Sequence, residues 1–315
     1  KKAYKVDLKW LLEKNGQFVN VNCPACNSKK RKKFFEKDRL KYHTCMVCNT
    51  VYISPRPSSK ILKEFYYQSK GYEAWTKYTF KVSEKSREKN LVIPRITLLK
   101  KYLKEYNVKS NLAIEIGPGY GTYTSYLKKK KIFKKVGVIE ANKDLIENCK
   151  KRKLNFLGND FEKINIKEKV NLLSGFEVIE HLFSPIKFLK KAHKILSSNS
   201  LIFISCPNVH GFDNILLGKN SGTFDHEHLN YFNPKSIKLL FEKNKFKILH
   251  LSTPGKLDVD LVCKYAQKNK KFLTKKSFLY HIIFNEDHKI RENFQNYLFN
   301  NLLSGHMLVL AQKKN

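Results

Sequence analysis

The sequence predicts a doubly wound α/β fold preceded by a small metal-binding module. Short apolar segments suited to buried parallel strands recur between residues 112 and 205, with helix-length stretches between them. A glycine turn of spacing G-x-G-x-G follows the first of these segments, at the place where such folds bring backbone close to a ligand. Two Cys-x2-Cys pairs near the N-terminus have the spacing of a four-thiolate zinc site.

Length and composition fit one large domain and one small one. The chain has 315 residues, of which 42% are hydrophobic. We expect a lead-in and cysteine module at 1–58, connecting helices at 59–105, and an α/β domain at 106–315 with a helical insertion at about 264–301. No apolar run reaches the roughly 18 residues of a membrane span, and Lys1-Lys2 leads into no signal-peptide core. These features predict a cytoplasmic protein with no membrane span.

The formal net charge of +35 raises the question of a nucleic-acid partner. Two observations weigh against it. Only 7 of the 62 basic residues are Arg, which pairs with phosphate more specifically than Lys does. The charge is also spread along the chain, since residues 1–60 hold 15 basic and 4 acidic side chains, a net +11. Nucleic acid therefore stays open as a partner, but a small molecule is favoured.

The first 58 residues hold a short helix and the cysteine module. Asp7 is expected to cap a helix over Leu8–Leu12. Eighteen residues separate the two cysteine pairs, so each pair can form one knuckle of a structural zinc ribbon. Disulfides are the alternative, and they are rare in the cytosol. The predicted zinc ligands are Cys23, Cys26, Cys45 and Cys48.

Residues 60–105 are expected to form helices that cross onto the α/β domain. Aromatic side chains are dense at their start, where they either line a substrate opening or pack between helices. They are Tyr66, Tyr67, Tyr72, Trp75 and Tyr78.

The α/β domain begins with a strand at Leu112–Ile116, and a helix is expected from Thr122. Between them lie Gly117, Gly119 and Gly121, which permit backbone conformations and close approaches that a side chain forbids. The spacing differs from the dinucleotide motif G-x-G-x-x-G.

Further strands follow the glycine turn at regular intervals. The second, Val136–Glu140, ends in an acid where doubly wound folds bind two ribose hydroxyls, and Glu140 lies 19 residues beyond Gly121. Gly158-Asn159-Asp160-Phe161 comes next, with Asp160 placed to meet an adenine amino group. The later strands are expected at Val170–Ser174, Leu201–Ser205, Phe246–Leu251 and His306–Ala311.

This series of motifs resembles the class I S-adenosylmethionine-dependent methyltransferases, over roughly Lys100 to Asn315. The resemblance rests on E-x-G-x-G-x-G, the acid at 140, G-N-D-F, and V-I-E-H-L at 178–182. It implies a Rossmann-like seven-stranded sheet that binds S-adenosylmethionine. It also implies that Glu115 steadies the amino-acid end of the cofactor, that Gly117, Gly119 and Gly121 admit it, that Glu140 holds the ribose, and that Asp160 with Phe161 meets the adenine.

His226, Glu227 and His228 stand in a row in the segment GTFDHEHLNYF, beyond the fifth predicted strand. A neutral His accepts a proton near pH 7, and a neighbouring acid can orient it. The segment resembles the H-E-H of zinc-ribbon sugar C-methyltransferases, which implies a general base at His228 with Glu227 beside it. The alternative is that His228 packs against the helix that follows. His181, in V-I-E-H-L, is the second candidate base.

The cysteine module followed by Y-I-S-P-R-P also resembles the zinc-ribbon leader of bacterial methyltransferases from cell-surface polysaccharide clusters. This implies a small polar acceptor, a nucleotide-linked sugar or a related surface-glycan precursor. Two departures leave C-, O- and N-methylation open: Asp225 stands where those C-methyltransferases have Tyr, and their second Rossmann-like domain is expected to be missing. An rRNA or tRNA methyltransferase with a zinc RNA-binding module, and a non-catalytic protein that keeps the cofactor fold, remain as alternatives.

Overall fold

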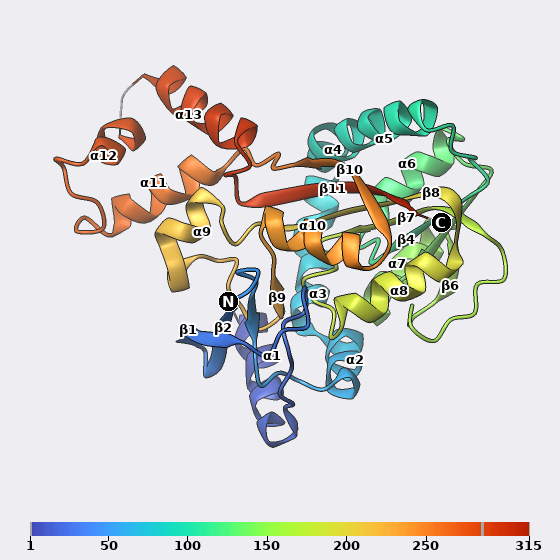
Figure 1. Cartoon of the computed structure of the whole chain (residues 1–315), viewed down its shortest axis with the longest axis horizontal. Helices are drawn as coiled ribbons and strands as arrows, with labels where there is room; N and C mark the ends of the chain where they lie inside the picture. Colours follow the sequence, from blue (N-terminus) through green and yellow to red (C-terminus); the bar gives the residue numbers. More distant parts are fainter. Residues whose placement is uncertain (1, 285–286, 315) are drawn as a thin grey trace.

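A seven-stranded sheet is the largest element of the computed structural model, which describes residues 2–284 and 287–314 (Figure 1). Its strand order is β10-β11-β8-β7-β4-β5-β6. The strands are β4 (Leu112–Ile116), β5 (Lys135–Ile139), β6 (Asn155–Gly158), β7 (Val170–Phe176), β8 (Leu196–Pro207), β10 (Phe246–Ser252) and β11 (His306–Lys313). The predicted doubly wound α/β fold is confirmed.

Six of the seven strands run in the same direction, so their carboxyl ends lie along one edge of the sheet. β6, β5, β4, β7 and β8 pair in parallel, and β11 is antiparallel to both of its neighbours, β8 and β10. Every residue of β4 is buried, as expected of a strand that is covered on both faces. The carboxyl ends of the parallel strands meet at one edge, so the loops that follow β4, β5, β6 and β7 lie together there.

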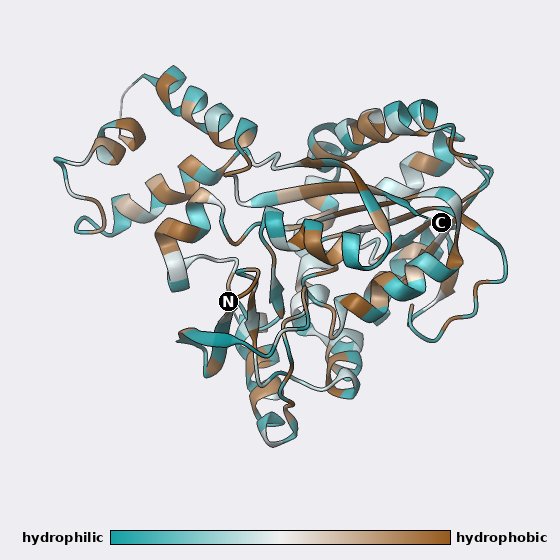
Figure 2. Cartoon of the chain, in the orientation of Figure 1, coloured by the Kyte–Doolittle hydropathy of each residue, from teal (hydrophilic) through white to brown (hydrophobic). Residues whose placement is uncertain are grey.

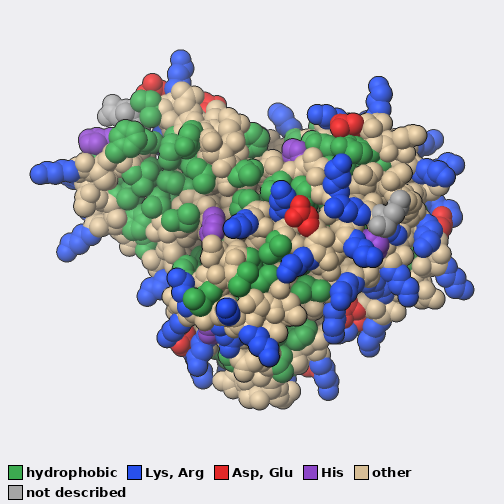
Figure 3. Space-filling view, in the orientation of Figure 1, with side chains coloured by type: hydrophobic (Ala, Val, Ile, Leu, Met, Phe, Trp, Pro, Cys, Tyr) green, Lys and Arg blue, Asp and Glu red, His purple; other side chains and the backbone are tan. Residues whose placement is uncertain are grey.

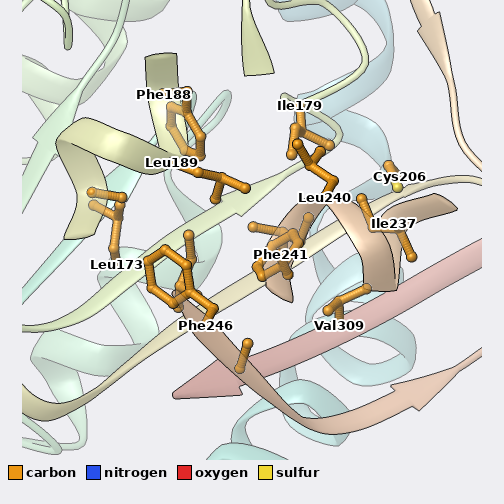
Figure 4. Packing of buried hydrophobic residues seen from close by; sticks show 14 of the residues in the cluster. Leu173, Ile179, Phe188, Leu189, Cys206, Ile237, Leu240, Phe241, Phe246 and Val309 are labelled. Atoms are coloured by element: carbon orange, nitrogen blue, oxygen red, sulfur yellow. The ribbon is translucent and has the colours of Figure 1, made fainter. Parts of the chain in front are cut away.

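Helices cover both faces of the sheet, and Figure 2 shows the apolar strands between them. On one face α8 (Pro185–Ile195) and α10 (Pro234–Lys243) bury Phe188, Leu189 and Phe241 against Leu173 and other strand residues (Figure 4). On the other face α5 (Ile93–Glu105) and α6 (Thr122–Lys129) pack against the alternate strand positions, Leu172 among them. α7 (Lys143–Lys151) follows β5. The alternation of strand side chains thus builds two cores from one sheet.

A second, four-stranded sheet contains the cysteine module, and its last strand comes from the α/β part of the chain. Its order is β1 (Arg31–Lys37), β2 (Leu40–Cys45), β3 (Val51–Ile53), β9 (Asn230–Tyr231), and all pairs are antiparallel. Val51 pairs with Tyr231 and Tyr52 with Asn230. Because β9 directly follows His226-Glu227-His228, the module is hydrogen-bonded to the segment that carries the candidate base.

The N-terminal helix differs from the prediction. α1 spans Lys2–Leu12, so Asp7 lies within it and does not cap it. The Asp7 carboxylate instead accepts hydrogen bonds from Ser69 Oγ at 2.7 Å, Lys70 N at 2.9 Å and Gly71 N at 2.7 Å. Asp7 therefore caps the start of α3 (Lys70–Ala74) from a distant part of the chain, an interaction that local sequence rules do not reveal.

The connecting segment forms one long helical run. α2 (Ser59–Gln68) comes first, and then α3, α4 (Lys81–Arg87) and α5 follow without a break because wider π-helical turns at Trp75–Phe80 and Glu88–Val92 join them. π-helical turns inside helices are frequent at functional sites. This run passes over the carboxyl edge of the parallel strands, as the contacts described below show.

The predicted insertion at 264–301 lies among helices at one end of the molecule, and its residues 285 and 286 lie outside the described residues. α11 (Asp258–Lys268), α12 (Phe278–Ile283) and α13 (His288–Asn300) pack with α9 (Phe212–Leu217) around a small core of their own (Figure 1). Apolar side chains, Phe278 and Leu261 among them, remain exposed there, and Figure 3 shows a broad apolar area over these helices. None of the described helices combines the length and apolar character that crossing a membrane requires.

Candidate active site

The four predicted zinc ligands converge. The Sγ atoms of Cys23, Cys26, Cys45 and Cys48 all lie within 4.8 Å of one another. The Cys23–Cys48 and Cys26–Cys45 pairs are 3.5 Å apart, much longer than the roughly 2.0 Å of a disulfide. Two sulfurs on one tetrahedral zinc would lie about 3.8 Å apart, given a Zn–S bond of about 2.3 Å. The donor set fits Zn²⁺ as four thiolates that leave no coordination position open for a substrate.

The glycine turn after β4 has the backbone that the sequence predicted. Gly117, Gly119 and Gly121 have φ values of +61°, +55° and +78°, which side chains other than hydrogen rarely permit. A Cβ on Gly117 would come within 2.8 Å of Val178 Cγ2, whereas a Cβ on Gly119 would have its nearest neighbour, Phe80 Cζ, at 3.9 Å. The turn therefore exposes bare backbone at the carboxyl edge of β4, which fits a nucleoside cofactor held by backbone contacts.

Glu140 follows β5 at the same edge. Its carboxylate accepts hydrogen bonds from Asn142 N at 2.9 Å and from Gly119 N at 3.4 Å, so it bridges the glycine turn and the start of α7. Burial raises the pKa of Glu140 to about 7. In its ionised form this carboxylate would accept hydrogen bonds from two ribose hydroxyls, the role that its position predicts.

The other predicted cofactor residues lie on neighbouring elements. Glu115 is buried in β4 and accepts a hydrogen bond from Thr124 Oγ1, and burial raises its pKa to about 7. Asp160 forms an ion pair with Lys63 at 2.7 Å. The Phe161 ring packs against Phe188 in the core, with ring centroids 5.1 Å apart. The roles of Glu115, Asp160 and Phe161 toward the cofactor stay predictions.

The helical run at 59–105 covers this edge. Lys63 of α2 reaches Asp160, and Glu84 of α4 forms an ion pair with Arg152 at 2.7 Å. Tyr66 makes the most informative contact. Its carbonyl oxygen accepts from Asn142 Nδ2 at 2.9 Å, next to Glu140, while its hydroxyl lies 3.2 Å from His181 Nδ1. One residue thus joins the candidate cofactor acid to a candidate base.

His181 and His228 lie together, with ring centroids 4.7 Å apart. His228 Nδ1 is 2.7 Å from the carbonyl oxygen of Thr223, and His181 Nδ1 is 3.0 Å from that of Glu227. Since a carbonyl only accepts, both Nδ1 atoms carry the proton, and each neutral ring then has a lone pair on Nε2. Burial lowers the pKa of His181 to about 3, and the neighbouring His228 adds to this effect. Each ring therefore offers a lone pair on Nε2, but a pKa of about 3 makes His181 a weak proton acceptor.

The His226 ring and the Glu227 carboxylate lie close to the N-terminal helix, which carries Tyr4 and Asp7. Donor atoms of Asp7, His226 and Glu227 lie within 4.8 Å of one another. Burial, together with the nearby Asp225 and Asp7 carboxylates, raises the pKa of Glu227 to about 8. Asp225 Oδ1 accepts from the backbone N–H groups of Glu227 and His228, both at 2.9 Å, and so fixes the loop. The structure brings His181, His228 and the Glu227 backbone together, but it does not bring the Glu227 carboxylate to the His228 ring by any described contact.

Sequence reasoning missed a partly exposed ionic cluster around Glu177. This residue follows β7 with φ +56°, accepts from Ser205 Oγ at 2.5 Å and lies 2.6 Å from His306 Nε2. Burial alone would raise the pKa of Glu177, but His306 and Ser205 hold it at about 2. Arg95 of α5 stacks over the Phe176 ring nearby, with its Cζ 4.0 Å from the ring centroid. Glu177 opens the same E-V-I-E-H-L segment that holds His181, which was the available signal.

Glu180 in that segment is fully buried, and neither carboxylate oxygen has a hydrogen-bond partner in the described part of the chain. Burial and the nearby Glu177 hold the pKa of Glu180 well above its usual range.

Comparisons with known proteins identify the fold. The family model described as "Methyltransferase domain" matches residues 90–251. A chain from the complex between the Haloferax volcanii Trm112 methyltransferase activator and a putative methyltransferase superposes with a TM-score of 0.52 at 12% identity, covering 78% of this chain and 98% of that one. A Clostridium acetobutylicum S-adenosylmethionine-dependent methyltransferase gives 0.51 at 11%, covering 77% and 100%. No curated protein matches the sequence.

The matched segment is more than half of the chain, and it contains the glycine turn, Glu140, Asp160, His181 and His228. The solved structures, at such low identity, support the fold alone. The chain therefore belongs to the methyltransferase domain family.

Proposed function

We propose that this protein transfers the methyl group of S-adenosylmethionine to a small polar acceptor, and that His228 takes the acceptor's proton. The observation that carries the proposal is the position of Tyr66. Its backbone meets Asn142 beside Glu140, and its hydroxyl meets His181, whose ring lies beside His228. The residues suited to hold the cofactor and those suited to accept a proton are thus linked at one edge of the sheet.

The cofactor, when bound, supplies a methyl group on a strongly electrophilic sulfonium. The chain's own residues do the rest. The glycine turn would admit the cofactor close to backbone, Glu115 would steady its amino-acid end, Glu140 would hold its ribose, and Asp160 with Phe161 would meet its adenine. The acceptor loses its proton to Nε2 of His228. The Nδ1–H group of the same ring donates a hydrogen bond to the Thr223 carbonyl throughout, and this bond keeps the ring oriented. Glu227 holds the neighbouring loop through its backbone carbonyl, which accepts from His181 and Tyr66.

We further propose that the acceptor is a nucleotide-linked sugar or a related surface-glycan precursor. The support is the H-E-H segment and its connection to a zinc ribbon, the combination that resembles sugar methyltransferases. The cysteine module shares a sheet with β9, which directly follows His228, so the module shapes the acceptor side of the site.

Variants of the two histidines test the mechanism. His228→Ala should lower turnover by roughly 10²–10⁴ while cofactor affinity, measured by calorimetry, stays nearly unchanged. His181→Ala is the matched comparison, because its ring has the same hydrogen bond from Nδ1 to a carbonyl and the same free Nε2. A larger loss in His181→Ala would move the role of base to His181. Full turnover in both variants, on the acceptor that the wild type methylates, would show that neither ring takes the proton.

A further inference from the structure

His226 is an anomaly among the described histidines. It is 1% exposed, and it is the one whose two ring nitrogens are both buried without a hydrogen-bond partner. Buried polar groups in native proteins nearly always have partners, so two orphaned nitrogens on one ring call for a ligand. The Tyr4 and Phe65 rings pack edge-on against His226, with centroids at 4.6 and 5.7 Å, and they offer its nitrogens no acceptor.

Two carboxylates meet at this ring. Glu227 Oε1 lies 4.0 Å from His226 Nε2, and an oxygen of Asp7 completes a set of three donor atoms within 4.8 Å of one another. A Cβ built on Gly71 would lie 3.0 Å from Asp7 Oδ2 and 3.3 Å from Glu227 Oε1, so both carboxylates face the same point on α3. Within the described residues neither acid forms an ion pair with Lys or Arg.

A protonated His226 does not account for the cluster. A charged imidazole would donate a hydrogen bond to Glu227, but 4.0 Å is too long for one. The 4.0 Å between His226 Nε2 and Glu227 Oε1 suits two atoms that bind the same ion better than it suits a hydrogen-bond donor and its acceptor. Asp7 accepts three hydrogen bonds of the roughly four that a carboxylate can take, which leaves one lone pair.

We propose that Asp7, His226 and Glu227 bind one divalent cation, separate from the zinc of the cysteine module. Two carboxylate oxygens and one imidazole nitrogen form a hard, mixed donor set, which suits Mn²⁺ and also accepts Zn²⁺ or Mg²⁺, with water in the remaining positions. The ion supplies the positive charge that the two acids lack and satisfies one nitrogen of His226.

This ion would hold the N-terminal helix against the catalytic loop. Asp7 belongs to α1 and caps α3, whereas His226 and Glu227 immediately precede the proposed base and β9. Binding of the ion does not depend on the reaction assigned above. Its role is to fix the loop, and the further role of positioning His228 rests on the proposed function.

Mn²⁺ binding to the full-length protein tests the proposal, because thiolates select zinc and leave Mn²⁺ to oxygen and nitrogen ligands. With the cysteine module loaded with zinc and no cofactor present, electron paramagnetic resonance should count one bound Mn²⁺ per chain. The near-isosteric variants Asp7→Asn and Glu227→Gln should each weaken this binding by about tenfold or more, and His226→Gln should do the same. Zinc content should stay unchanged in all three.

Asp213→Asn is the matched control, since Asp213 is also 5% exposed but lies outside the cluster, and it should bind Mn²⁺ like the wild type. Mn²⁺ should also raise the melting temperature of the wild type and not that of Asp7→Asn. The proposal is overturned if the wild type binds no Mn²⁺, Zn²⁺ or Mg²⁺ beyond the cysteine module, or if binding persists unchanged in the three ligand variants. S-adenosylmethionine binding, measured separately, reports on the methyltransferase assignment alone.

Discussion

Glu140 is the residue through which the proposed cofactor binding should depend on pH. It is 6% exposed at the end of β5, and its oxygens accept hydrogen bonds from the backbone N–H groups of Gly119 and Asn142. Burial without a cationic partner disfavours the ionised form, which is why the pKa rises to about 7. Two ribose hydroxyls would donate further hydrogen bonds to the ionised carboxylate. Binding of the cofactor should therefore favour ionisation of Glu140, and ionisation of Glu140 should favour binding.

We therefore expect affinity for S-adenosylmethionine to rise with pH. A carboxyl of pKa about 7 is mostly protonated at pH 6 and mostly ionised at pH 8, so if only the ionised form accepts both hydroxyls, affinity should rise about tenfold over that interval. Calorimetry at several pH values measures it. Glu140→Gln should bind more weakly and lose this pH dependence. A dependence that stays equally steep in Glu140→Gln would assign the titration to another group, Glu115 first, because burial raises its pKa to about 7 as well.

At the scale of elements, the sequence predicted what local patterns encode. The strands β4, β7 and β11 were recognisable because buried parallel or central strands need short apolar runs. The cysteine cluster was recognisable because its spacing alone defines two knuckles. β9 was not, since two residues, Asn230 and Tyr231, show no alternation, and their pairing with β3 is set by tertiary contacts.

The same limit applied to side chains whose partners lie far away in the chain. Asp7 looked like a local cap, but its partners are Ser69, Lys70 and Gly71. Glu177 and His306 form an ion pair, although several helices and strands lie between them in the sequence. The cofactor and zinc residues could be proposed from strand order and residue spacing alone. The contacts of Asp7 and Glu177 could not, because they depend on how distant parts of the chain pack.

The shared sheet connects the cysteine module to the segment that carries the proposed base. Cys48→Ser should remove the zinc, lower the melting temperature, and reduce turnover more than it reduces cofactor affinity, because β3 holds β9 and β9 follows His228. Cys263→Ser is the control, a buried cysteine outside the cluster that should keep the zinc. Metal analysis and melting curves measure both. Zinc retained in Cys48→Ser, or iron in its place in the wild type, would refute the assignment.

At the scale of the whole molecule, three parts of the chain meet at one edge of one sheet. The parallel strands carry the proposed cofactor residues, the helical run at 59–105 covers them, and the cysteine module pairs through β9 with the loop that carries the proposed base. The net charge of +35 is distributed over the surface, and Figure 3 shows Lys and Arg side chains spread across the visible face. The helices α11 and α13, at the far end of the molecule, pack around a separate core and carry none of the proposed site residues.

The most direct test of this account is which cofactor the protein binds. S-adenosylmethionine, or its demethylated product, should raise the melting temperature and bind one per chain in calorimetry, because a ligand that binds only the folded state stabilises it. NAD should do neither, since the turn G-x-G-x-G lacks the dinucleotide spacing. Glu140→Ala should remove most of the shift caused by S-adenosylmethionine. Stabilisation by NAD, with none by S-adenosylmethionine, would contradict the central claim that this protein is a methyltransferase.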